Sequence, residues 1–488
     1  MTYLRILVAP LVLLLSACIT LGPDYDRQQA TQWEAEPATW QQPLPHDGDP
    51  VALVAWWAQF KDPVLIELVE QSQKQSSSIA QAALRIAQAR ALLVTADGAA
   101  LPVLNATGAL SRGTYQLGGP VVVATTAQAQ LQAGWELDLF GGLARGSQAA
   151  RARLEAQVAN WHEARLSVSA DTASLYTNYR SCEQLSQLAR ADAQSRAQTA
   201  RLTQILAQTG FQAPANAALA RASAAEGQSR AVAQRAECDL LIKALVALTA
   251  IPEPALRNQL KKGARLLPSP AMPVVQRIPA QLLLQRPDIA AAERELAAAS
   301  ADIGVREAER FPRLSLLGSI GPLSFESGVG SISATSWSIG PSLSLPIFDA
   351  GRRAANVETA KIAYEVAATN YRTQARRAVR EVEDALVRLD SLNQREAESV
   401  KAAKGYRESL QAAQERYKYG LASILDLEET RRLSVNADNI LAIVQRERVN
   451  AYIALYRAVG GGWDAQDLVA VVRAVQQNPN EVLTGKLP

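Results

Sequence analysis

Histidine is almost absent from the sequence, and cysteine is rare. The 488 residues include two histidines, His46 and His162, and three cysteines. The histidines are far apart and have no neighbour of the kind that ligates a metal, which argues against histidine-based metal sites and triads. The strings GxxxxGK[ST], GxSxG and HExxH do not occur either. We therefore expect no enzyme activity and no metal.

Aromatic residues and excess charge are also scarce. Aromatics make up 5% of the chain, and 50 basic residues are set against 47 acidic ones. A nucleic-acid-binding protein of this size should carry a basic excess or patch, so no nucleic-acid partner is expected. Hydrophobic residues reach 48% and are mostly alanine and leucine, which argues against global disorder and favours long, closely packed helices.

Residues 1–17 have the composition of a secretory signal. Arg5 precedes an apolar run, 11–15, that is too short to span a membrane. The run ends in LSAC at 15–18, which resembles a bacterial lipobox, where cleavage leaves an N-terminal cysteine that carries diacylglycerol. We expect Cys18 to be acylated; an ordinary signal with an incidental cysteine is the alternative. Ile19, rather than Asp, favours the outer membrane by resemblance to sorted lipoproteins. No later run of 18 apolar residues predicts a spanning helix.

The chain repeats itself at an offset of about 210 residues. Pro102 and Pro312 are 210 positions apart, and so are Gly210 and Gly420. A nearly constant offset across separate landmarks indicates a tandem duplication of a unit of about 200 residues. The expected organisation is a signal at 1–17, a lipid-anchored segment at 18–62, a first repeat at 63–265, a second repeat at 266–465 and a C-terminal tail at 466–488.

Each repeat contains two stretches with the alternation of a half-buried strand. Apolar residues occupy the odd positions of 129–139 and of 337–347. A soluble sheet would share this pattern, but the lengths match outer-membrane strands of roughly 9–11 residues. Four strands are too few for a membrane barrel, and open edges are not tolerated in lipid, so further copies must complete the barrel. The expected strands are about 102–116, 128–140, 312–326 and 335–348.

Long helical stretches follow the strands in both repeats. At ~1.5 Å per residue, the longest reach ~95–100 Å. Apolar residues step by three and four along 379–389 and 433–444, which is typical of coiled-coil seams. The pattern predicts two antiparallel hairpins, about 146–250 and 351–460, with tips at Gly210 and Gly420. Such helices form a tube or stalk rather than a compact core.

Two cysteines, Cys182 and Cys238, remain after acylation and lie in an oxidising compartment. Each is 28 residues from Gly210, so an antiparallel hairpin places them at the same level of neighbouring helices. A disulfide is within reach if they face each other. The equivalent second-repeat positions are Leu392 and Arg448, so the architecture does not require the bridge. Two buried free thiols are the alternative.

Five short strings occur in a characteristic order along about residues 18–470. They are LGPDY at 21–25, WWAQFKDPVL at 56–65, RPDI at 286–289, FPRLSL at 311–316 and GGGW at 460–463. Each is weak alone, but together they make the chain resemble the TolC-like outer-membrane efflux protein family, in its lipoprotein branch.

The resemblance implies an α+β membrane protein built from tandem duplicated β-β-α-α units. A homotrimer would form a 12-stranded outer-membrane β-barrel, continuous with a 12-helix periplasmic α-barrel and an equatorial domain. The implied function is the passive exit duct of a tripartite efflux pump for drugs or other small molecules. The implied partners are a periplasmic adaptor (membrane fusion) protein and an inner-membrane RND-type transporter. No cofactor is implied beyond the covalent lipid on Cys18.

Two other functions share parts of this pattern. The same duct serves type I protein secretion in some systems, although the lipobox and LGPDY string look more like those of resistance pumps. A purely structural envelope lipoprotein would lack the paired membrane-strand hairpins. An adaptor and transporter gene beside this one, as opposed to a secretion ATPase and a toxin, would separate the first two alternatives.

The resemblance also implies a periplasmic gate at the second hairpin tip. Tyr417, Asp426 and Glu429 match family positions that take part in closure, and Arg416 lies in the same tip. Three-fold symmetry would turn the two acidic residues into stacked rings of carboxylates, which raise one another's pKa and attract cations. Leu425 adds an apolar constriction. Without the resemblance, the simpler interpretation is that the charged residues of this set are ordinary solvent-exposed side chains at the tip of a helical hairpin.

Two departures from the family pattern weaken the predicted closure. Some relatives carry Arg where this chain has Ala422. The first hairpin has Asn216 at the position of the Asp that receives the tyrosine hydrogen bond. Tyr417 can still bond this amide, but the charged link is lost, so we expect the closed state to be held less firmly.

Overall fold

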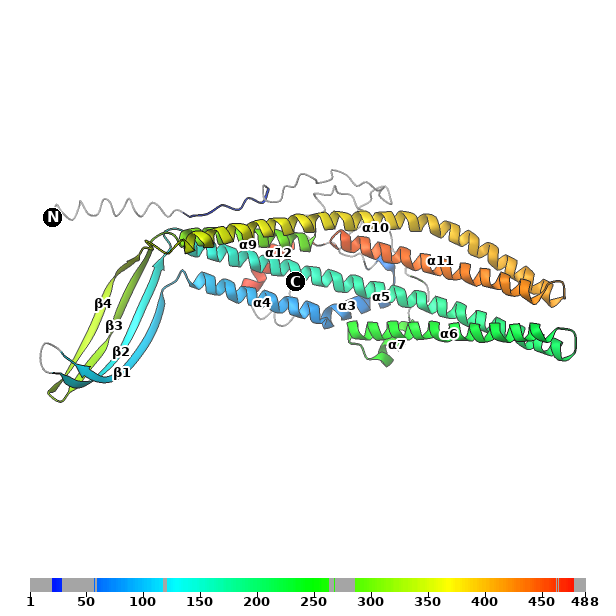
Figure 1. Cartoon of the computed structure of the whole chain (residues 1–488), viewed down its shortest axis with the longest axis horizontal. Coiled ribbons are helices and arrows are strands. Elements are labelled where there is room, and N and C mark those ends of the chain that lie inside the picture. The colour runs from blue at the N-terminus through cyan, green and yellow to red at the C-terminus, as the bar shows by residue number, and fades with distance from the viewer. Residues whose placement is uncertain are drawn as a thin grey trace.

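The computed structural model is an elongated molecule with a sheet at one end and helical tips at the other (Figure 1). The structure describes residues 20–28, 57, 59–116, 121–262, 267, 286–461, 463 and 465–477. The sequence Gly118-Gly119-Pro120 predicts the tip of the first strand hairpin, but these residues, like Cys18 and Trp56, lie outside the described residues. The expected order of elements, in which strand pairs are followed by long helical hairpins, is present in both halves.

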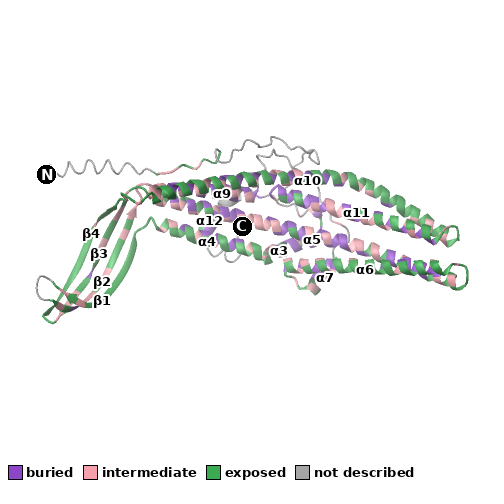
Figure 2. Cartoon of the chain, in the orientation of Figure 1, coloured by how far each residue is buried: buried purple, intermediate pink, exposed green. Residues whose placement is uncertain are grey.

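Four antiparallel strands form a single sheet in the order β1-β2-β3-β4. Within the described chain, β1 and β4 each pair on one side only, so both edges of the sheet are open. Large apolar side chains, including Trp337 and Ile339, are exposed on the sheet, and Figure 2 shows that the strands are mostly exposed. The strands are β1 (Val103–Tyr115), β2 (Val122–Leu137), β3 (Arg313–Ser327) and β4 (Gly330–Ser344).

The second and fourth strands begin earlier than predicted, at Val122 and Gly330 rather than near 128 and 335. Backbone pairing explains the difference, because Val122 pairs with Tyr115 and Gly330 pairs with Ser327 although these segments lack a clean alternation. Both strands also end three or four residues before the predicted positions. After β2 the chain turns, and the Asp138 carboxylate accepts a hydrogen bond from Ala144 N at 2.8 Å.

Two antiparallel hairpins of long helices follow the strands. The first is α5 (Gly142–Gln208) and α6 (Pro214–Thr249), and the second is α10 (Arg352–Lys418) and α11 (Ile424–Ala458). Both α5 and α10 have 67 residues, as a duplicated unit requires, and span ~100 Å at ~1.5 Å per residue. Along the described helices, none is both long and apolar enough to cross a membrane.

The predicted glycines make the turns at both tips. Gly210 and Gly420 have φ of 79° and 74°, a left-handed conformation that glycine adopts without strain. The next residue closes each turn, with Phe211 N donating to Leu206 O and Leu421 N donating to Arg416 O, both at 2.8 Å.

Shorter helices pack along the long ones from the sheet to their middle (Figure 1). We call the middle part, where α6 and α11 end, the waist. Its buried core joins residues of α3, α5, α6, α7, α10 and α11, among them Leu68, Tyr176 and Leu389. Trp57 packs its ring on Phe60 and Tyr456. The short helices are α3 (Pro63–Gln75), α4 (Ser77–Gly98), α7 (Glu253–Lys262), α9 (Pro287–Ala308) and α12 (Ala465–Gln477).

The predicted coiled-coil seams are buried to different extents. Val382, Leu386 and Leu389 are buried along α10. On α11, Ala437 and Val444 are buried, but Leu433 and Ile440 are exposed and line a groove with Tyr406. One chain thus leaves part of the α11 seam uncovered.

Candidate functional site at the helical tips

Asp426 closes the N-terminus of α11. Its Oδ2 accepts hydrogen bonds from Ser423 N at 3.0 Å and Ser423 Oγ at 2.8 Å, while Asp426 N donates to Ser423 Oγ at 3.1 Å. This reciprocal arrangement is a capping box. The bonds from Ser423 lower the pKa of Asp426 below its usual range. In the single chain this carboxylate is therefore more acidic than usual. In a three-fold ring of Asp426 carboxylates, repulsion between the like charges would instead raise its pKa.

The other predicted tip residues are exposed at the same end. Glu429 Oε1 and Oε2 accept from Arg432 Nη2 at 2.6 and 2.7 Å, an exposed pair one helical turn apart. Leu425 is 63% exposed. Arg416 Nη2 donates to the carbonyl of Leu421 at 3.4 Å. The fold thus brings the predicted residues to one tip.

Tyr417 contacts the first hairpin through a different residue from the one predicted. Its hydroxyl lies 2.8 Å from Thr203 Oγ1 on α5. Asn216 instead donates through Nδ2 to Gln212 Oε1 at 2.8 Å. The expected bond between Tyr417 and the Asn216 amide is therefore wrong, because Asn216 bonds within its own turn and Thr203 faces the tyrosine. A position matched to a family motif does not identify the partner that faces it.

A buried ionic network lies behind the tip and joins both hairpins. Glu428 Oε2 accepts from Arg196 Nη1 at 2.9 Å and from Ser223 Oγ at 2.6 Å. Arg196 Nε donates to Asp192 Oδ2 at 2.8 Å. Glu428 comes from α11, Ser223 from α6, and the other two from α5. Arg196 and Asp192 are buried. The network therefore ties three long helices together.

Arg431 adds a second buried cation to this network. Its guanidinium pairs with Glu428, and its Nη2 donates to Thr199 Oγ1 at 3.0 Å. The residue is 2% exposed. Burial first, and then the charge of Arg196, lower the pKa of Arg431, while Glu428 opposes that effect. Sequence reasoning missed Arg431. One available signal was its position among the buried residues Leu427 and Ser434 on one face of α11.

The two remaining cysteines face each other across the first hairpin. The structure joins Cys182 of α5 and Cys238 of α6 in a disulfide, with a Cα–Cα distance of 5.5 Å. At the equivalent positions of the second hairpin, Leu392 is buried and Arg448 pairs with Glu396. The disulfide lies 14 residues before Arg196 on α5, about 21 Å from the ionic network at ~1.5 Å per residue.

Arg286, in the RPDI string, links helices as well as starting α9. Its Nη1 donates to the carbonyl of Ala458 at the end of α11 at 2.8 Å, and its Nη2 pairs with Asp288 at 2.8 Å and Glu381 at 2.9 Å. Pro287 occupies the first turn of α9, where proline is tolerated because its missing N–H would have no partner in the helix. The guanidinium thus connects the start of α9, the end of α11 and the middle of α10 at the waist.

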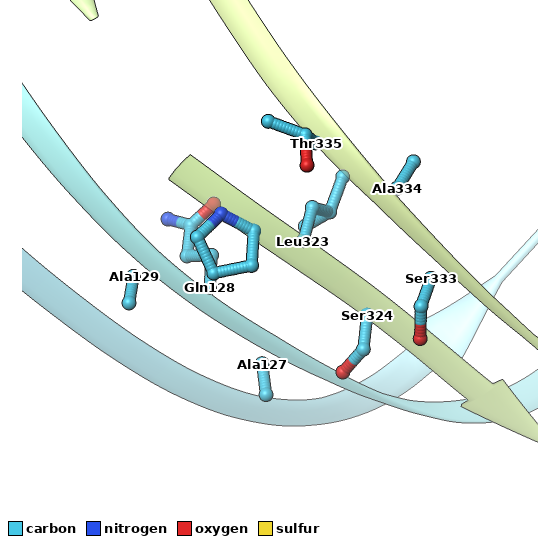
Figure 3. A pocket seen from close by; sticks show the side chains of 9 residues that line it. Ala127, Gln128, Ala129, Leu323, Ser324, Ser333, Ala334 and Thr335 are labelled. Atoms are coloured by element: carbon cyan, nitrogen blue, oxygen red, sulfur yellow. The ribbon is translucent and has the colours of Figure 1, made fainter. Parts of the chain in front are cut away.

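Two further hollows of the described chain differ in their lining. The one beside Arg286 is lined largely by charged side chains, among them Asp288 and Glu381. Figure 3 shows a shallow depression between β2, β3 and β4, lined by small or weakly polar side chains such as Ala127, Ser324 and Thr335. Among the described residues, no group of three or more His, Cys, Asp or Glu side chains could hold a metal ion.

An open sheet with an exposed apolar surface, joined end to end with helical hairpins of ~100 Å, defines a class of protein. That class is the outer-membrane channel with a helical extension. The chain belongs to the outer membrane efflux protein family, whose model it matches over residues 68–251 and 278–461. The two matched segments are 210 residues apart, in agreement with the repeat.

Similar proteins support this assignment over nearly the full length. Nodulation protein T of Rhizobium leguminosarum bv. trifolii is 34% identical over 464 residues, which cover 93% of this chain and 96% of the relative. Outer membrane protein OprJ of Pseudomonas aeruginosa is 32% identical over 467 residues, covering 93% and 95%. The solved structure of the outer-membrane channel OprN superposes with a TM-score of 0.81 at 29% identity, covering 91% of this chain and 99% of OprN.

The resemblance found in the sequence is thereby confirmed. The fold is that of the TolC-like outer-membrane channels, and the chain is an efflux channel protein of the outer membrane. The family consists of channels rather than enzymes, so the expected lack of catalytic activity is confirmed on that ground.

Proposed function

We propose that three copies of this chain form the outer-membrane exit duct of a tripartite efflux pump. The duct passively conducts drugs or other small molecules that a periplasmic adaptor (membrane fusion) protein and an inner-membrane RND-type transporter deliver. The observation that carries the proposal is the sheet of four strands whose edges, β1 and β4, are open within the described chain. Unpaired backbone groups are not tolerated in lipid, so a barrel closed by several copies is required.

The helices favour the same assembly. Each chain supplies four long helices, α5, α6, α10 and α11, and three chains supply twelve. The exposed groove of Tyr406, Leu433 and Ile440 offers an apolar face for the helices of the next copy. Native mass spectrometry of the detergent-solubilised protein should give a trimer, and planar bilayers should show single-channel conductance. A stable monomer without conductance would rule the proposal out.

We propose that Cys18 is acylated and anchors the chain beside the barrel. The sequence LSAC at 15–18 supports this, and a relative named "Probable outer membrane lipoprotein SilC", from Salmonella typhimurium, is 30% identical over 480 residues. One lipid chain binds a membrane only marginally, but lipid and barrel together make dissociation negligible. Radiolabelled palmitate should enter the wild type and not Cys18→Ala. Equal labelling of both would contradict acylation at this residue.

We propose that the tip of the second hairpin is the periplasmic gate. Tyr417, Leu425, Asp426 and Glu429, with Arg416, are its surface residues. The network of Glu428, Arg196 and Arg431 holds it from behind, because it links the second hairpin to both helices of the first. Closing the gate brings the tips of three chains together, and opening it requires the hairpins to shift relative to each other.

Small-molecule export is favoured over type I protein secretion by the names of the relatives. "Solvent efflux pump outer membrane protein SrpC" of Pseudomonas putida is 29% identical over 464 residues, and "Cation efflux system protein CusC" of Escherichia coli is 29% identical over 462. The two names differ in what is exported, so they support a duct with little selectivity of its own. Affinity purification of the cross-linked channel should recover an RND-type transporter and its adaptor. Recovery of a secretion ATPase would favour the alternative.

A further inference from the structure

Residues 20–25 pack closely on the surface where the sheet meets the helices, and we call the contact surface around Gly141, Arg145 and Gly304 the groove. Leu21 N donates to the carbonyl of Phe140, between β2 and α5, at 3.1 Å. Arg145, in the first turns of α5, donates through Nε to the carbonyl of Leu21 at 3.1 Å and through Nη2 to Asp24 at 2.7 Å. Arg145 is 4% exposed. Without this segment, much of the hydrogen bonding of a buried guanidinium would be lost, which is costly.

The groove is shaped by glycines that allow close approach. Gly22 has φ of 87°, and a Cβ there would lie 2.4 Å from Gly304 Cα. A Cβ on Gly304 would lie 2.7 Å from Leu21 O, and one on Gly141 would lie 2.7 Å from Thr20. These distances are shorter than side-chain carbons adopt, so the segment fits only because the three positions have no side chain.

Tyr25 is the anchor at the far end of the segment. Its hydroxyl donates to Glu293 Oε1 of α9 at 2.6 Å, and Glu293 is buried. The ring packs against an alanine surface contributed by both α5 and α9. That surface is Ala149, Ala152, Ala297, Ala298 and Ala301. The segment therefore contacts the first repeat through α5 and the second through α9.

We propose that residues 20–25 are a docking strap that fixes the N-terminal end of the mature chain at the rim between sheet and helices and fastens α5 to α9. Cys18 precedes Thr20 by two residues, so its Cα stays within about 7 Å of that of Thr20. The lipid then enters the membrane beside the base of the strands, on the side of the helical extension. This consequence rests on the proposed acylation and membrane orientation; the docking does not.

The docking can be tested by asking whether residues 20–25 stay bound to the channel after the polypeptide is cleaved behind them. A specific protease site is inserted between residues 29 and 50, in a chain that carries Cys18→Ala behind an ordinary cleavable signal, so that no lipid holds the fragment. After cleavage and gel filtration in detergent, mass spectrometry should find the N-terminal fragment with the channel. Release of the fragment from this otherwise unchanged channel would overturn the docking strap.

Gly304→Ala and Gly146→Ala form a matched pair of variants. A Cβ at Gly304 meets Leu21 O, whereas a Cβ at Gly146, next to Arg145 on α5, meets nothing within 4 Å. Overpacking of this kind should reduce retention of the fragment at least about tenfold for Gly304→Ala. Gly146→Ala should retain it fully, and equal retention by both would contradict the groove. Circular dichroism confirms that both variants are folded.

Palmitate labelling distinguishes a failure of the docking strap from a failure of the proposed lipid anchor on Cys18. If the N-terminal fragment is retained but the wild-type protein takes up no palmitate, the docking strap is supported, and the inference that the strap positions a lipid is overturned. A labelled wild type together with a released fragment would overturn the strap and leave acylation supported. The two failures are therefore distinguishable.

Discussion

The hydroxyl oxygens of Tyr417 and Thr203 lie 2.8 Å apart and connect the second hairpin to the first just behind the tips. Thr203 Oγ1 donates to the carbonyl of Thr199 at 2.8 Å. Because that carbonyl can only accept, the tyrosine hydroxyl must be the donor to Thr203. One neutral hydrogen bond contributes only ~1 kcal/mol, so this contact alone holds a gate weakly. The buried charges around Glu428 must supply more of the closure.

Replacing Tyr417 by Phe should remove this bond and keep the ring. We expect the equilibrium between closed and open hairpins to shift about fivefold toward opening in each chain, since ~1 kcal/mol corresponds to that factor. Thr203→Val should have a similar effect, and the double variant should add little to either single one, because both remove the same bond. Single-channel recordings in planar bilayers measure the change.

Asn216→Ala is the control for this prediction. Asn216 bonds Gln212, so its removal should leave channel opening unchanged. If Asn216→Ala opened the channel as much as Tyr417→Phe did, and Thr203→Val did not, the amide would be the true partner of the tyrosine.

Glu428 and Glu429 are neighbours in sequence with different surroundings. Glu428 lies between two buried arginines, whereas Glu429 pairs with Arg432 on the surface. Removing one partner of a buried pair costs ~3–5 kcal/mol, while an exposed pair contributes ~0–1 kcal/mol. Glu428→Gln should therefore lower the melting temperature and raise the open probability, and Glu429→Gln should change melting little.

Differential scanning calorimetry on the detergent-solubilised channel checks the melting temperatures, and planar bilayers check opening. Equal melting temperatures for the two variants would show that Glu428 is not buried between charges in the assembled protein.

The carboxylates of the tip should control ion flow through the closed duct. The double variant Asp426→Ala with Glu429→Ala should raise single-channel conductance and weaken block by divalent cations. Each substitution removes one negative charge per chain from the constriction, and this charge is what attracts the blocking cations. Asp426 also caps α11, so loss of the cap could by itself widen the tip.

Asp426→Asn combined with Glu429→Gln separates charge from capping. The Asn side chain keeps an oxygen that accepts from Ser423 N, and only the charge is lost. Weakened divalent block in this variant would assign the effect to charge. Unchanged conductance and block in both double variants would leave Asp426 and Glu429 as surface charges.

Much of the architecture was readable from local patterns and symmetry. The turns at Gly210 and Gly420 follow from backbone geometry, and the equal level of Cys182 and Cys238 along the hairpin follows from their equal distance from Gly210. That the two side chains face each other is known only from the structure. The early start of β2 was not readable, because backbone pairing extends a strand beyond its alternating part.

The interior of the candidate gate was harder to predict. Arg196 and Glu428 are separated by 232 residues, and each looks like an ordinary helix-surface charge in the sequence. Only the packing of the two hairpins brings them together and buries them. The wrong partner for Tyr417 has the same origin, since a motif gives a position along a helix and not the residue across from it.

The disulfide should be detectable in the isolated protein. Alkylation without reductant should leave Cys182 and Cys238 unmodified, and mass spectrometry should find their peptides linked. With a sequence separation of 56 residues, loss of the bridge should lower the free energy of unfolding by about 3–5 kcal/mol. Cys182→Ser with Cys238→Ser measures that loss. Alkylation of both thiols without reductant would mean that no bridge forms.

His162 should make the channel less stable in acid. Its ring lies between Trp161 and Trp463, and its Nε2 has no hydrogen-bond partner among the described residues. Burial first, and then the charge of Arg165, lower the pKa of His162 from 6.5 to about 4. It is therefore more than the plain helix-face residue that its sequence position indicates.

The sign of the pH effect follows from proton binding. Between pH 6.5 and about 4, the unfolded chain binds a proton on His162 and the folded chain does not. Stability linked to this residue is thus fully present above pH 6.5 and is lost as the pH falls toward 4. The slope approaches ~1.4 kcal/mol per pH unit within that window. Burial raises the pKa of the neighbouring Glu163, which has the opposite effect on stability in acid.

His162→Gln isolates the histidine contribution, because Glu163 is present in both proteins. The melting temperature of the wild type should fall more steeply than that of the variant between pH 7.5 and pH 4.5. At pH 7.5 the difference between the two proteins reflects packing alone, since neutral histidine and glutamine are both uncharged. A difference that stays constant across this range would show that His162 is accessible to water and titrates normally in the folded channel.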